Sequence, residues 1–579
     1  MAQLAADGTL ARDCAADAVD AFERYNAEFR AITRRAPRHF EERDWHASQR
    51  DAVERIELYG RYVERTVASL KLRLGGETTD RALWASIKKE FTGLIDALPD
   101  AEFRKTFFNS LTRNFFGTVG VSPEIEFVAL DLDPLARLAD YDFLTTYQNR
   151  GSLQLLFEEV LSAFRCKAPW RGFERSVRYV AEEVERHCQT VGENRGAQRV
   201  EMIRPVFYQM TRAYLVGRVT GRDWQMPLVI VLKNTERGLL VDAVMTRDAD
   251  VSVLFSFTRS YFHVDLERVG RALLFLHQLM PHKPVSELFT VIGRAKQGKT
   301  ERYRELFRHL QSATDQFVRA PGERGLVMVV FTLPSFDVVF KLIRDRFPVQ
   351  KNIAREDVLR KYEFVFKHDR AGRLVDAQEF KRLRFPRSLF EKTLLDELLS
   401  ETAASVHEDG DDLIIDHCYI ERRMTPLNIY LREAIPEDCE LAVLDYGQAI
   451  RDLAYTNIFA GDLLLKNFGV TRNRRVIFYD YDELCLVTDC RFRDLPEAQS
   501  DEDEMRGEAW YYVADNDVFP ETFINFLGFD DAVRAVFLMA HGEVLTAEWW
   551  RAVQNRLRAD DVIEVLPYGA HRVRVASSA

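Results

Sequence analysis

The sequence predicts an α+β protein with a mainly helical N-terminal domain and a C-terminal domain of two lobes. Three observations predict this architecture. The chain has 579 residues, which is too long for a single hydrophobic core. Residues 1–190 repeat apolar side chains at the spacing of amphipathic helices. Beyond residue 315, β-branched and aromatic runs alternate with glycine-containing turns, and helical segments follow after residue 421.

We place the domains at residues 1–314 and 315–579, and divide the second into lobes at about 315–420 and 421–579. The composition is that of an ordinary globular protein, with 47% hydrophobic and 30% charged residues. The net charge of −11 argues against a nucleic-acid-binding role, which needs a basic surface. Apolar runs of about 18 residues are lacking, so we expect no membrane-spanning helix.

The N-terminal segment and the cysteines indicate a cytoplasmic protein. The segment MAQLAADGTLARDCAADAVDAF contains an early aspartate and lacks the apolar stretch of a signal peptide. The seven cysteines are scattered and form no CxxC pair, which favours reduced thiols over disulfides or a zinc site. We expect most of them to be small core residues.

Aromatic residues mark the expected helices of the N-terminal domain. Two apolar stripes recur at helical spacing: Phe22, Tyr25, Phe29 and Ile32, and then Ile56, Tyr59, Tyr62, Val63 and Val67. The segment 103–116 is rich in phenylalanine, and we favour core packing there over a ligand-stacking surface. Between residues 206 and 264 the pattern predicts three or four antiparallel strands. Helices are expected to resume at 265–279 and near 299–310.

The segment 293–300, GRAKQGKT, matches the phosphate-binding P-loop pattern G-x₄-GK[ST]. A P-loop needs a buried strand before it and a parallel sheet around it. The preceding residues 286–292 are few and directly follow Pro284, and alternating strands and helices do not follow. We therefore interpret the segment as the basic first turn of a helix. A P-loop nucleotide-dependent switch using Lys299 and Thr300 is the alternative function.

A glycine-containing hairpin and a lysine-bearing strand open the C-terminal domain. Residues 317–331 are predicted to form strand, tight loop and strand, and the next strand carries Lys341 among apolar neighbours. In protein kinases such a hairpin covers the phosphates of ATP, and such a lysine neutralises their charge. A charge on a buried strand needs a partner, and we expect Glu391 or Glu397 from a helix at 385–401.

Polar residues follow a predicted helix at 441–458 and a predicted strand at 476–479. A protein kinase needs one aspartate to orient the acceptor hydroxyl, and an asparagine and a second aspartate to hold Mg²⁺. The structural alternative is that these are turn residues and helix caps. The order of helix, acidic loop, hairpin and acidic strand end favours a kinase site. The candidate residues are Asp462, Lys466, Asn467, Asp480 and Asp482.

Several unusual motifs together resemble the bacterial isocitrate dehydrogenase kinase/phosphatase family, over nearly the whole chain. They are APGERGLVMVVFTLPSFDVVFKLI, RKYEFVFKHDRAGRLVDAQEFKRL, CYIERRMTPLNIYL, DYGQAIRDLAYTNIFAGDLLLKNFGV and FYDYDE. The resemblance implies a helical regulatory domain followed by a bilobal protein-kinase-like domain.

It also implies one active site that phosphorylates a serine of NADP-dependent isocitrate dehydrogenase and removes that phosphate again. ATP and ADP would be its nucleotides, with Mg²⁺ or Mn²⁺ as the metal ion. AMP, as an allosteric effector, and metabolites would bias the direction, and so switch carbon between the citric acid cycle and the glyoxylate bypass. Isocitrate dehydrogenase is the implied partner; we expect no nucleic-acid or membrane partner, and a homodimer is left open.

The resemblance assigns roles to individual residues. The nucleotide loop falls on Ala320, Pro321, Gly322, Glu323, Arg324, Gly325 and Leu326, and the ATP lysine on Lys341. The catalytic loop falls on Asp462, Lys466 and Asn467, the metal-binding strand end on Asp480 and Asp482, and the family's acidic active-site position on Asp376. By its own pattern Asp376 is an ordinary exposed strand residue, so its role rests on the resemblance. Whether Asp376 or Asp462 is the key catalytic acid stays open.

The role of Asp482 has two alternatives. On a strand, Asp480 and Asp482 would share one face, so Asp482 could position a water for phosphate removal or could simply cap the turn. A non-catalytic scaffold with a pseudokinase lobe is a third hypothesis. The intact set of Lys341, Asp462, Asn467 and Asp480 counts against it.

Overall fold

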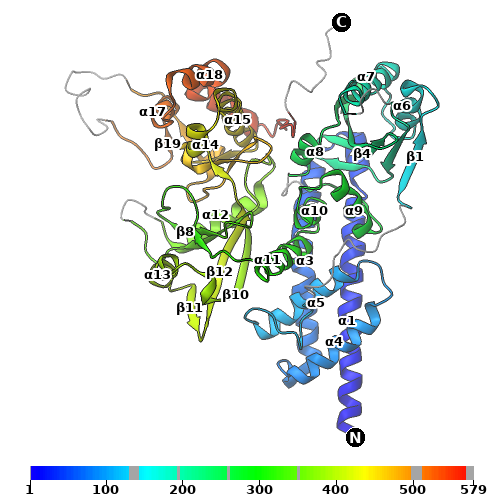
Figure 1. Ribbon diagram of the computed structural model, residues 1–579, viewed down its shortest axis with the longest axis vertical. Coiled ribbons are helices and arrows are strands. Elements are labelled where there is room, and N and C mark those ends of the chain that lie inside the picture. The colour runs from blue at the N-terminus through cyan, green and yellow to red at the C-terminus, as the bar shows by residue number, and fades with distance from the viewer. Residues whose placement is uncertain are drawn as a thin grey trace. The chain divides into compact units, whose positions relative to one another are not determined.

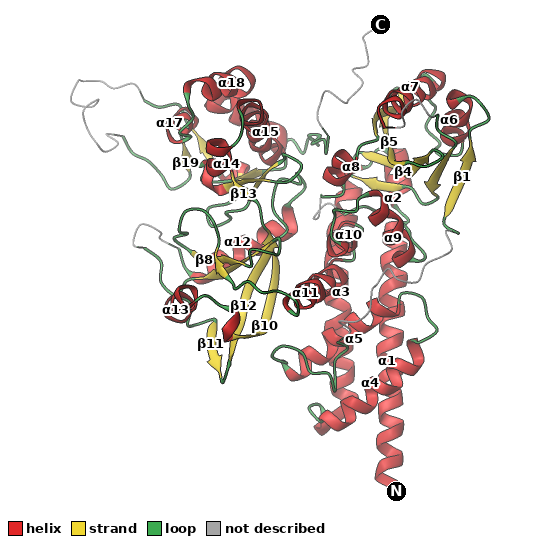
Figure 2. Cartoon of the chain, viewed as in Figure 1, coloured by secondary structure: helices red, strands yellow, loops and turns green. Residues whose placement is uncertain are grey.

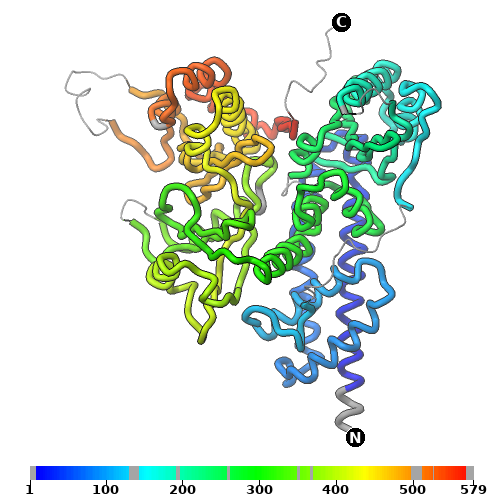
Figure 3. The backbone as a smooth tube through the Cα atoms, in the orientation of Figure 1, coloured from blue at the N-terminus to red at the C-terminus, as the bar shows by residue number. Residues whose placement is uncertain are grey.

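A computed structural model describes residues 2–128, 142–191, 196–256, 261–348, 353–496 and 511–568. The chain divides into two compact units, one of residues 1–313 with 568–579 and the other of residues 314–567. Figure 3 traces each unit along the chain by colour. Helices and antiparallel sheets occur together, so the structure has the α+β class that the sequence predicts.

Packed helices open the N-terminal unit. They are α1 (Ala2–Thr33), α2 (Ala36–Glu42), α3 (Trp45–Leu74), α4 (Arg81–Ile95) and α5 (Ala101–Phe116). Their apolar stripes face one another: the ring of Tyr25 on α1 contacts that of Tyr59 on α3 edge to face at 5.4 Å. Helices α1 and α3 lie side by side (Figure 1). Phe103 and Phe107 of α5 are buried in the same core, which confirms that the phenylalanine-rich segment is packing.

An antiparallel sheet forms the second part of this unit. Its strands are β1 (Leu144–Gln148), β2 (Arg199–Ile203), β3 (Phe207–Gln209), β4 (Arg212–Thr220), β5 (Gln225–Thr235) and β6 (Gly238–Met245). The order is β1-β2-β4-β5-β6, with β3 paired to β4. Helices α6 (Leu153–Ser162) and α7 (Phe173–Val191) share the hydrophobic core of this sheet. The predicted strands are confirmed up to Met245, but residues 248–254 form helix α8 instead of a strand.

The unit continues with α9 (Val269–Leu279), α10 (Val285–Val291) and α11 (Ala295–Leu310). The residues before GRAKQGKT therefore form a helix, whereas a P-loop requires a strand there. Gly298 lies inside α11, where a Cβ atom would lie 2.3 Å from Thr290 Oγ1 of α10. This glycine allows two helices to pack closely, so the P-loop alternative is not favoured.

A six-stranded antiparallel sheet begins the second unit (Figure 2). Its strands are β7 (Val318–Arg319), β8 (Met328–Thr332), β9 (Val338–Ile343), β10 (Gln378–Pro386), β11 (Val406–Asp409) and β12 (Asp412–Arg422). The order is β10-β12-β9-β8-β7, with β11 paired to β12. A cluster of phenylalanine rings, among them Phe317, Phe331 and Phe340, fills one face of the sheet.

Two helices of this lobe differ from the sequence prediction. Helix α12 runs from Arg355 to His368, whereas the aromatic-rich run YEFVFK at 362–367 predicts a strand by its local pattern. Val358, Tyr362 and Val365 recur at helical spacing and are buried on one face, which explains why the helix continues. Helix α13 (Lys392–Glu401) begins later than predicted, because β10 extends to Pro386 before it.

The other lobe is mainly helical, with short strands. Its helices are α14 (Leu427–Glu433), α15 (Pro436–Tyr455), α17 (Phe523–Phe526), α18 (Asp531–His541) and α19 (Ala547–Arg558). The short strands and 3₁₀ turns are β13 (Thr425–Pro426), β14 (Ile458–Phe459), η3 (Leu465–Asn467), β15 (Phe468–Val470), β16 (Val476–Phe478), β17 (Cys485–Leu486), η4 (Val487–Asp489), β18 (Arg491–Phe492) and β19 (Asp517–Val518). Tyr446 of α15 is fully buried and donates to Leu463 O at 2.5 Å, which fixes the loop after β14 on this core. The acidic run SDEDE at 500–504 predicts a solvated loop by its composition, and it lies outside the described residues.

Candidate active site

Lys341 lies on β9 with its ammonium group aimed at the acidic strand end of the other lobe. It is 6% exposed, and Nζ donates to Tyr479 O at 2.7 Å. Nζ also lies 5.0 Å from the centre of the Tyr479 ring. Tyr479 directly precedes Asp480, so the lysine predicted to bind ATP lies beside the aspartate predicted to bind Mg²⁺.

The partner of Lys341 is Glu421, and the prediction of Glu391 or Glu397 is wrong. Glu421 lies on β12, which pairs with β9, and its Oε2 is 2.8 Å from Lys341 Nζ. The glutamate is 1% exposed. A neighbouring strand can supply this carboxylate because residues close to one another in paired strands share a face. The sequence signal was an acidic residue inside the apolar run CYIE at the end of β12.

Glu397 of α13 holds the nucleotide loop instead. Its carboxylate contacts Arg319 at 2.5 Å, Arg344 at 3.1 Å and Arg324 at 3.3 Å. Burial opposes ionisation of Glu397, but hydrogen bonds from Arg319 and Arg344 outweigh it and lower the pKa of the carboxyl group. Arg319 directly precedes the loop 320–326, so α13 fixes where the loop begins.

The predicted nucleotide loop connects β7 to β8, and its residues are largely exposed. Gly322 has a φ of 122°, a conformation that favours glycine. At Gly325 a Cβ atom would lie 2.8 Å from Met328 O, so this tight hairpin also needs glycine. Arg344 Nε donates to Gly325 O at 3.0 Å, which anchors the far end of the loop on β9.

The loop 460–467 brings Asp462, Lys466 and Asn467 together after β14. Asp462 Oδ1 accepts from the N–H of Leu464 at 2.9 Å, and Asn467 Nδ2 donates to Asp462 O at 3.3 Å. Asn467 is 3% exposed. These bonds make the loop compact and turn the amide of Asn467 toward the loop that carries Asp462.

This loop is joined to both neighbouring parts of the site. The N–H of Tyr479 donates to Asn467 O at 3.0 Å, so the Asn467 loop and the Asp480 strand end lie side by side. Lys466 Nζ is 3.1 Å from Glu323 Oε2, which links the catalytic loop to the nucleotide loop. At Gly461 a Cβ atom would lie 2.5 Å from Glu483 O, so the turn after Asp480 packs on the same loop.

Asp376 is buried, not exposed as its sequence pattern predicts. It is 9% exposed and lies before β10 rather than on a strand. Leu374 bridges Phe478 in parallel, so the chain carrying Asp376 runs beside β16 toward Asp480. Tyr481 donates its hydroxyl to Val375 O at 2.7 Å, which holds the two segments together. The structure therefore brings Asp376 to the same strand end as Asp480.

Arg373 fixes the Asp376 segment on α15. It is buried and binds Asp445 at 2.6 Å and Asp452 at 2.8 Å. Burial opposes ionisation of Asp445, but the nearby Arg373 outweighs it and lowers the pKa of the carboxyl group. Sequence reasoning missed Arg373 because its carboxylate partners are far along the chain and on a separate element.

Asp482 does not share a strand face with Asp480, so that expectation is wrong. Strand β16 ends at Phe478, and Asp482 lies in the turn that follows Asp480. The turn still packs on the catalytic loop through the close approach of Gly461 to Glu483 described above. Asp482 therefore stays near the site for a different geometric reason.

The predicted metal-binding residues Asn467 and Asp480 do not form a complete metal site by themselves. Among the described residues, His, Cys, Asp and Glu side chains do not gather in groups of three or more that could hold a metal ion. Mg²⁺ in kinases takes one or two carboxylate or amide oxygens and completes its shell with phosphate and water. Asn467 and Asp480 fit this requirement, since hydrogen bonding places their loops side by side.

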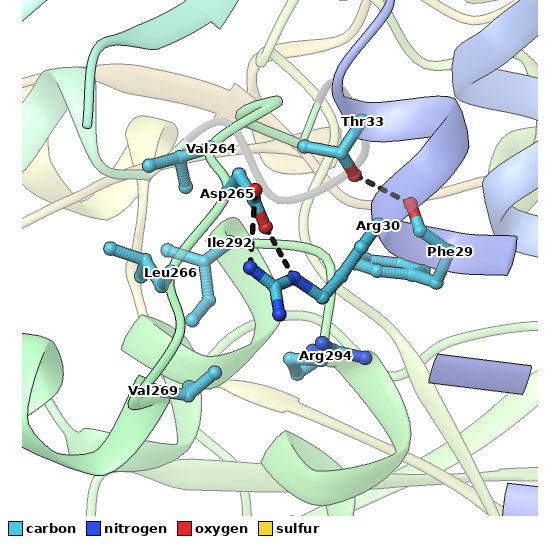
Figure 4. A pocket seen from close by; sticks show the side chains of 9 residues that line it. All are labelled: Phe29, Arg30, Thr33, Val264, Asp265, Leu266, Val269, Ile292 and Arg294. Atoms are coloured by element: carbon cyan, nitrogen blue, oxygen red, sulfur yellow. Dashed lines mark hydrogen bonds and ion pairs between the residues drawn. The ribbon is translucent and has the colours of Figure 1, made fainter. Parts of the chain in front are cut away.

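A cavity in the N-terminal unit is too small for a nucleotide. It measures about 10 Å³ and lies between α1 and the segment before α9 (Figure 4). Arg30 Nε binds Asp265 Oδ1 across it at 2.5 Å. The guanidinium group of Arg294 lies 4.1 Å from the centre of the Phe29 ring, and both side chains line the cavity. A space of this size holds about one water molecule.

Comparison with known families matches both units. Residues 15–314 match the regulatory domain and residues 315–570 the kinase domain of isocitrate dehydrogenase kinase/phosphatase (AceK). The chain belongs to the isocitrate dehydrogenase kinase/phosphatase family. A relative of that name from Anaeromyxobacter sp. (strain Fw109-5) is 47% identical over 547 residues, covering 94% of this chain and 95% of the relative. One from Xanthomonas euvesicatoria pv. vesicatoria (strain 85-10) is 48% identical over 555 residues, covering 96% of each.

A third member of the isocitrate dehydrogenase kinase/phosphatase family, from Anaeromyxobacter dehalogenans (strain 2CP-C), is 48% identical over 573 residues, covering 97% of each chain. The resemblance seen in the sequence is thereby confirmed. Among the described residues, helices long and apolar enough to cross a membrane are absent.

Proposed function

We propose that this protein phosphorylates and dephosphorylates a serine of isocitrate dehydrogenase at one site in its kinase-like unit. Family membership supports a kinase/phosphatase enzyme, and the relatives carry the name of that substrate. The observation that best supports a single active site is the hydrogen bond from Lys341 Nζ to Tyr479 O. Tyr479 directly precedes Asp480. This hydrogen bond brings the residue that would bind the nucleotide to the residue that would bind its metal ion.

The nucleotide would lie between the loop 320–326 and the catalytic loop. ATP supplies the transferred phosphoryl group, and Mg²⁺ or Mn²⁺ neutralises its charge. Lys341 would bind the α- and β-phosphates, and the main-chain N–H groups of the glycine loop would cover them. Asn467 and Asp480 would offer oxygen ligands to the metal ion. Lys466 would add a positive charge, and its ion pair with Glu323 holds it beside the loop 320–326.

Two aspartates are candidates for orienting the serine hydroxyl. Asp462 occupies the position of the kinase catalytic aspartate in the chain order, and one of its oxygens accepts the N–H of Leu464. Asp376 is buried beside the Asp480 strand end, and its Oδ2 accepts from Gln378. Asp376→Asn and Asp462→Asn separate the roles. The variant that loses kcat at unchanged KM identifies the hydroxyl-orienting residue.

The phosphatase reaction would use the same residues. Among the described residues, no group of three or more His, Cys, Asp or Glu side chains is placed to form a separate metal centre. The phosphoserine would enter where the serine lay, and its phosphate would pass to ADP or to a water positioned by an acidic residue. Asp482 is the candidate for that residue, and a structural turn-capping role is its alternative.

The regulation follows the same proposal. AMP and metabolites would bias the direction of transfer and so control flux between the citric acid cycle and the glyoxylate bypass. The enzyme would act in the cytoplasm, a reducing compartment that fits its seven scattered cysteines, which form no disulfide in the structure. Assembly as a homodimer is part of the proposal that sedimentation of the purified protein tests.

The experiment uses the full-length protein, NADP-dependent isocitrate dehydrogenase and ATP labelled at the γ-phosphate. We expect label on a serine in the presence of Mg²⁺, and its release when ADP and AMP are added in a chase. Lys341→Ala should lose both reactions, while Lys299→Ala, the matched control in the P-loop-like segment, should keep both. If Lys299→Ala loses them and Lys341→Ala does not, the kinase-like site is wrong.

A further inference from the structure

Two cysteines lie side by side directly after the acidic strand end. Cys485 belongs to β17, and Cys490 follows η4. Their sulfur atoms are 3.5 Å apart, and both thiols are free. Cys485 is half-buried, whereas Cys490 is 7% exposed. This is a reduced dithiol within reach of a covalent bond, in the part of the chain that follows Asp480 and Asp482.

We propose that Cys485 and Cys490 are a modification site, at which a hydroperoxide reversibly forms an intramolecular disulfide that lowers the activity of the kinase-like unit. The structural alternative is that the two thiols only fill the core between β17 and α19. Core packing alone does not require two sulfur atoms in contact.

Cys485 is the better candidate for the thiol that reacts first, because it is more exposed than Cys490 and lies near the Lys361 ammonium group. The hydrogen bond between the two thiols lowers the pKa of Cys485; burial opposes this, and the nearby Lys361 ammonium group lowers the pKa further. Lys361 donates to Leu484 O, which holds its charge next to the sulfur. Asp489 and Glu483 oppose ionisation more weakly. The same hydrogen bond, together with burial, raises the pKa of Cys490, so Cys490 remains protonated while Cys485 reacts with the peroxide.

The chemistry balances with one hydroperoxide molecule. The Cys485 thiolate attacks a peroxide oxygen, the O–O bond breaks, and a sulfenic acid forms while the leaving oxygen takes a proton. Cys490 sulfur then attacks the Cys485 sulfur, the S–O bond breaks, and the leaving hydroxide takes the proton of Cys490 to become water. The two thiols lose two electrons in total, and the peroxide gains them. A dithiol reductant reverses the bond by exchange.

The disulfide would act on the active site through strand pairing. Cys485 pairs with Phe459 and Leu486 with Ile458, so β17 and β14 form one small ladder. Phe459 directly precedes the loop of Asp462, and Cys485 follows the turn of Asp482. A covalent S–S bond is shorter than the present contact by roughly 1.5 Å. A shift of this size in groups that align a phosphoryl transfer lowers the rate by roughly ten- to hundred-fold.

The bond can be detected without any measurement of activity. Trypsin cuts after Arg475 and Arg491, so both cysteines lie in one peptide, residues 476–491, with no other cysteine. After treatment of the full-length protein with hydrogen peroxide, we expect this peptide to lose the mass of two hydrogen atoms and to resist alkylation. Dithiothreitol should restore two alkylatable thiols. Two alkylated thiols, or oxygen adducts without loss of hydrogen, would overturn the proposal.

The functional arm uses single serine variants and a matched cysteine. In the wild type, peroxide should lower transfer of label to isocitrate dehydrogenase roughly ten- to hundred-fold, and dithiothreitol should restore it. Cys490→Ser should resist this loss, and Cys439→Ser, which alters a buried cysteine of α15, should behave as the wild type. Equal loss in Cys490→Ser and the wild type would overturn the regulatory role.

A failure of the proposed kinase reaction would be visible separately, as an absence of transfer in the untreated protein. If Cys490→Ser does not fold, Cys485→Ser gives the same test, and the peptide measurement on the wild type needs no variant.

Discussion

Loss of the ion pair between Lys341 and Glu421 should have the strongest effect on kinase activity and on the stability of residues 314–567. Both side chains are buried, and the nitrogen and oxygen are 2.8 Å apart. Glu421→Gln keeps the shape and one oxygen acceptor but removes the negative charge. Lys341 then keeps its bond to Tyr479 O, so the ammonium group stays inside the protein without the carboxylate of its ion pair.

The expected magnitude follows from this geometry. A hydrogen bond involving a charged group contributes about 1.5–3 kcal/mol, and Glu421→Gln weakens one such bond without deleting it. Glu421→Met removes the oxygen as well, and breaking a buried ion pair in this way costs about 3–5 kcal/mol. We therefore expect Glu421→Gln to lower kcat/KM of the kinase reaction roughly ten- to hundred-fold, and Glu421→Met to destabilise the fold of residues 314–567.

The assay combines kinetics with hydrogen exchange in the full-length protein. Peptides covering β9 and β12 should exchange faster in Glu421→Met, because the pair lies between these two strands. The matched controls are the two glutamates that the sequence favoured. Glu391→Gln alters an exposed residue and should leave kinase activity unchanged. Glu397→Gln should raise KM for ATP more than it lowers kcat, because Glu397 holds the nucleotide loop through Arg319.

Two results for the glutamate variants would contradict the role given to Glu421. If Glu391→Gln lowers kcat/KM more than Glu421→Gln does, the lysine has another partner in the working enzyme. If Glu421→Met leaves exchange in β9 and β12 unchanged, the buried pair does not stabilise this sheet.

Further predictions concern the nucleotide site, the metal ion and acid stability. Lys341→Ala would remove the proposed charge-assisted contact with phosphate and should weaken ATP binding by about 1.5–3 kcal/mol in a calorimetric titration, while Lys299→Ala should leave it within a few-fold. Asp480→Asn should raise the Mg²⁺ concentration needed for half-maximal kinase activity, and normal activity at ordinary Mg²⁺ would remove Asp480 from the site. The folded-state pKa of Asp445 is lowered, so its contribution to stability is present at neutral pH and is lost as the pH falls through that pKa. Asp445→Asn should therefore destabilise the protein at neutral pH by about 1–3 kcal/mol, and denaturant unfolding should show this difference shrink in acid. Asp482→Ala should lower phosphatase activity more than kinase activity, and equal losses would leave Asp482 as a turn cap.

Local patterns predicted much of the fold. The stripe through Phe22, Tyr25 and Phe29 is buried in α1, as the helical spacing indicates. The strand carrying Lys341 and the hairpin before it are also present. These features depend on neighbours within a few residues, so the periodicity of one segment is enough to predict them.

The errors concern residues whose environment comes from distant parts of the chain. Asp376 lies in a polar segment that looks exposed, and it is buried because Arg373 binds Asp445 and Asp452 about 70 or more residues away. Glu421 was overlooked because strand pairing, not sequence distance, brings it to Lys341. The turn at Asp482 was misplaced because β16 ends at Phe478, where pairing with β15 stops.

The candidate site also combines residues that local motifs predict with residues that only distant contacts reveal. Chain order and motif chemistry predicted the residues that would bind nucleotide and metal. The structure brings Lys341 and Asn467 together through their hydrogen bonds with the main chain of Tyr479. The residues that hold these groups in place, such as Glu397 and Arg373, carry no motif of their own. Their roles become visible only when the contacts between elements are known.

If one site carries out both phosphoryl transfers, Lys341→Ala must lose phosphatase activity together with kinase activity. Phosphorylated isocitrate dehydrogenase is incubated with the wild type and with Lys341→Ala, each with and without ADP, and release of phosphate is measured. We expect the wild type to need nucleotide, and Lys341→Ala to lose phosphatase activity as steeply as kinase activity. Robust phosphate release by Lys341→Ala in nucleotide-free buffer would contradict the single site, because a second site would then exist.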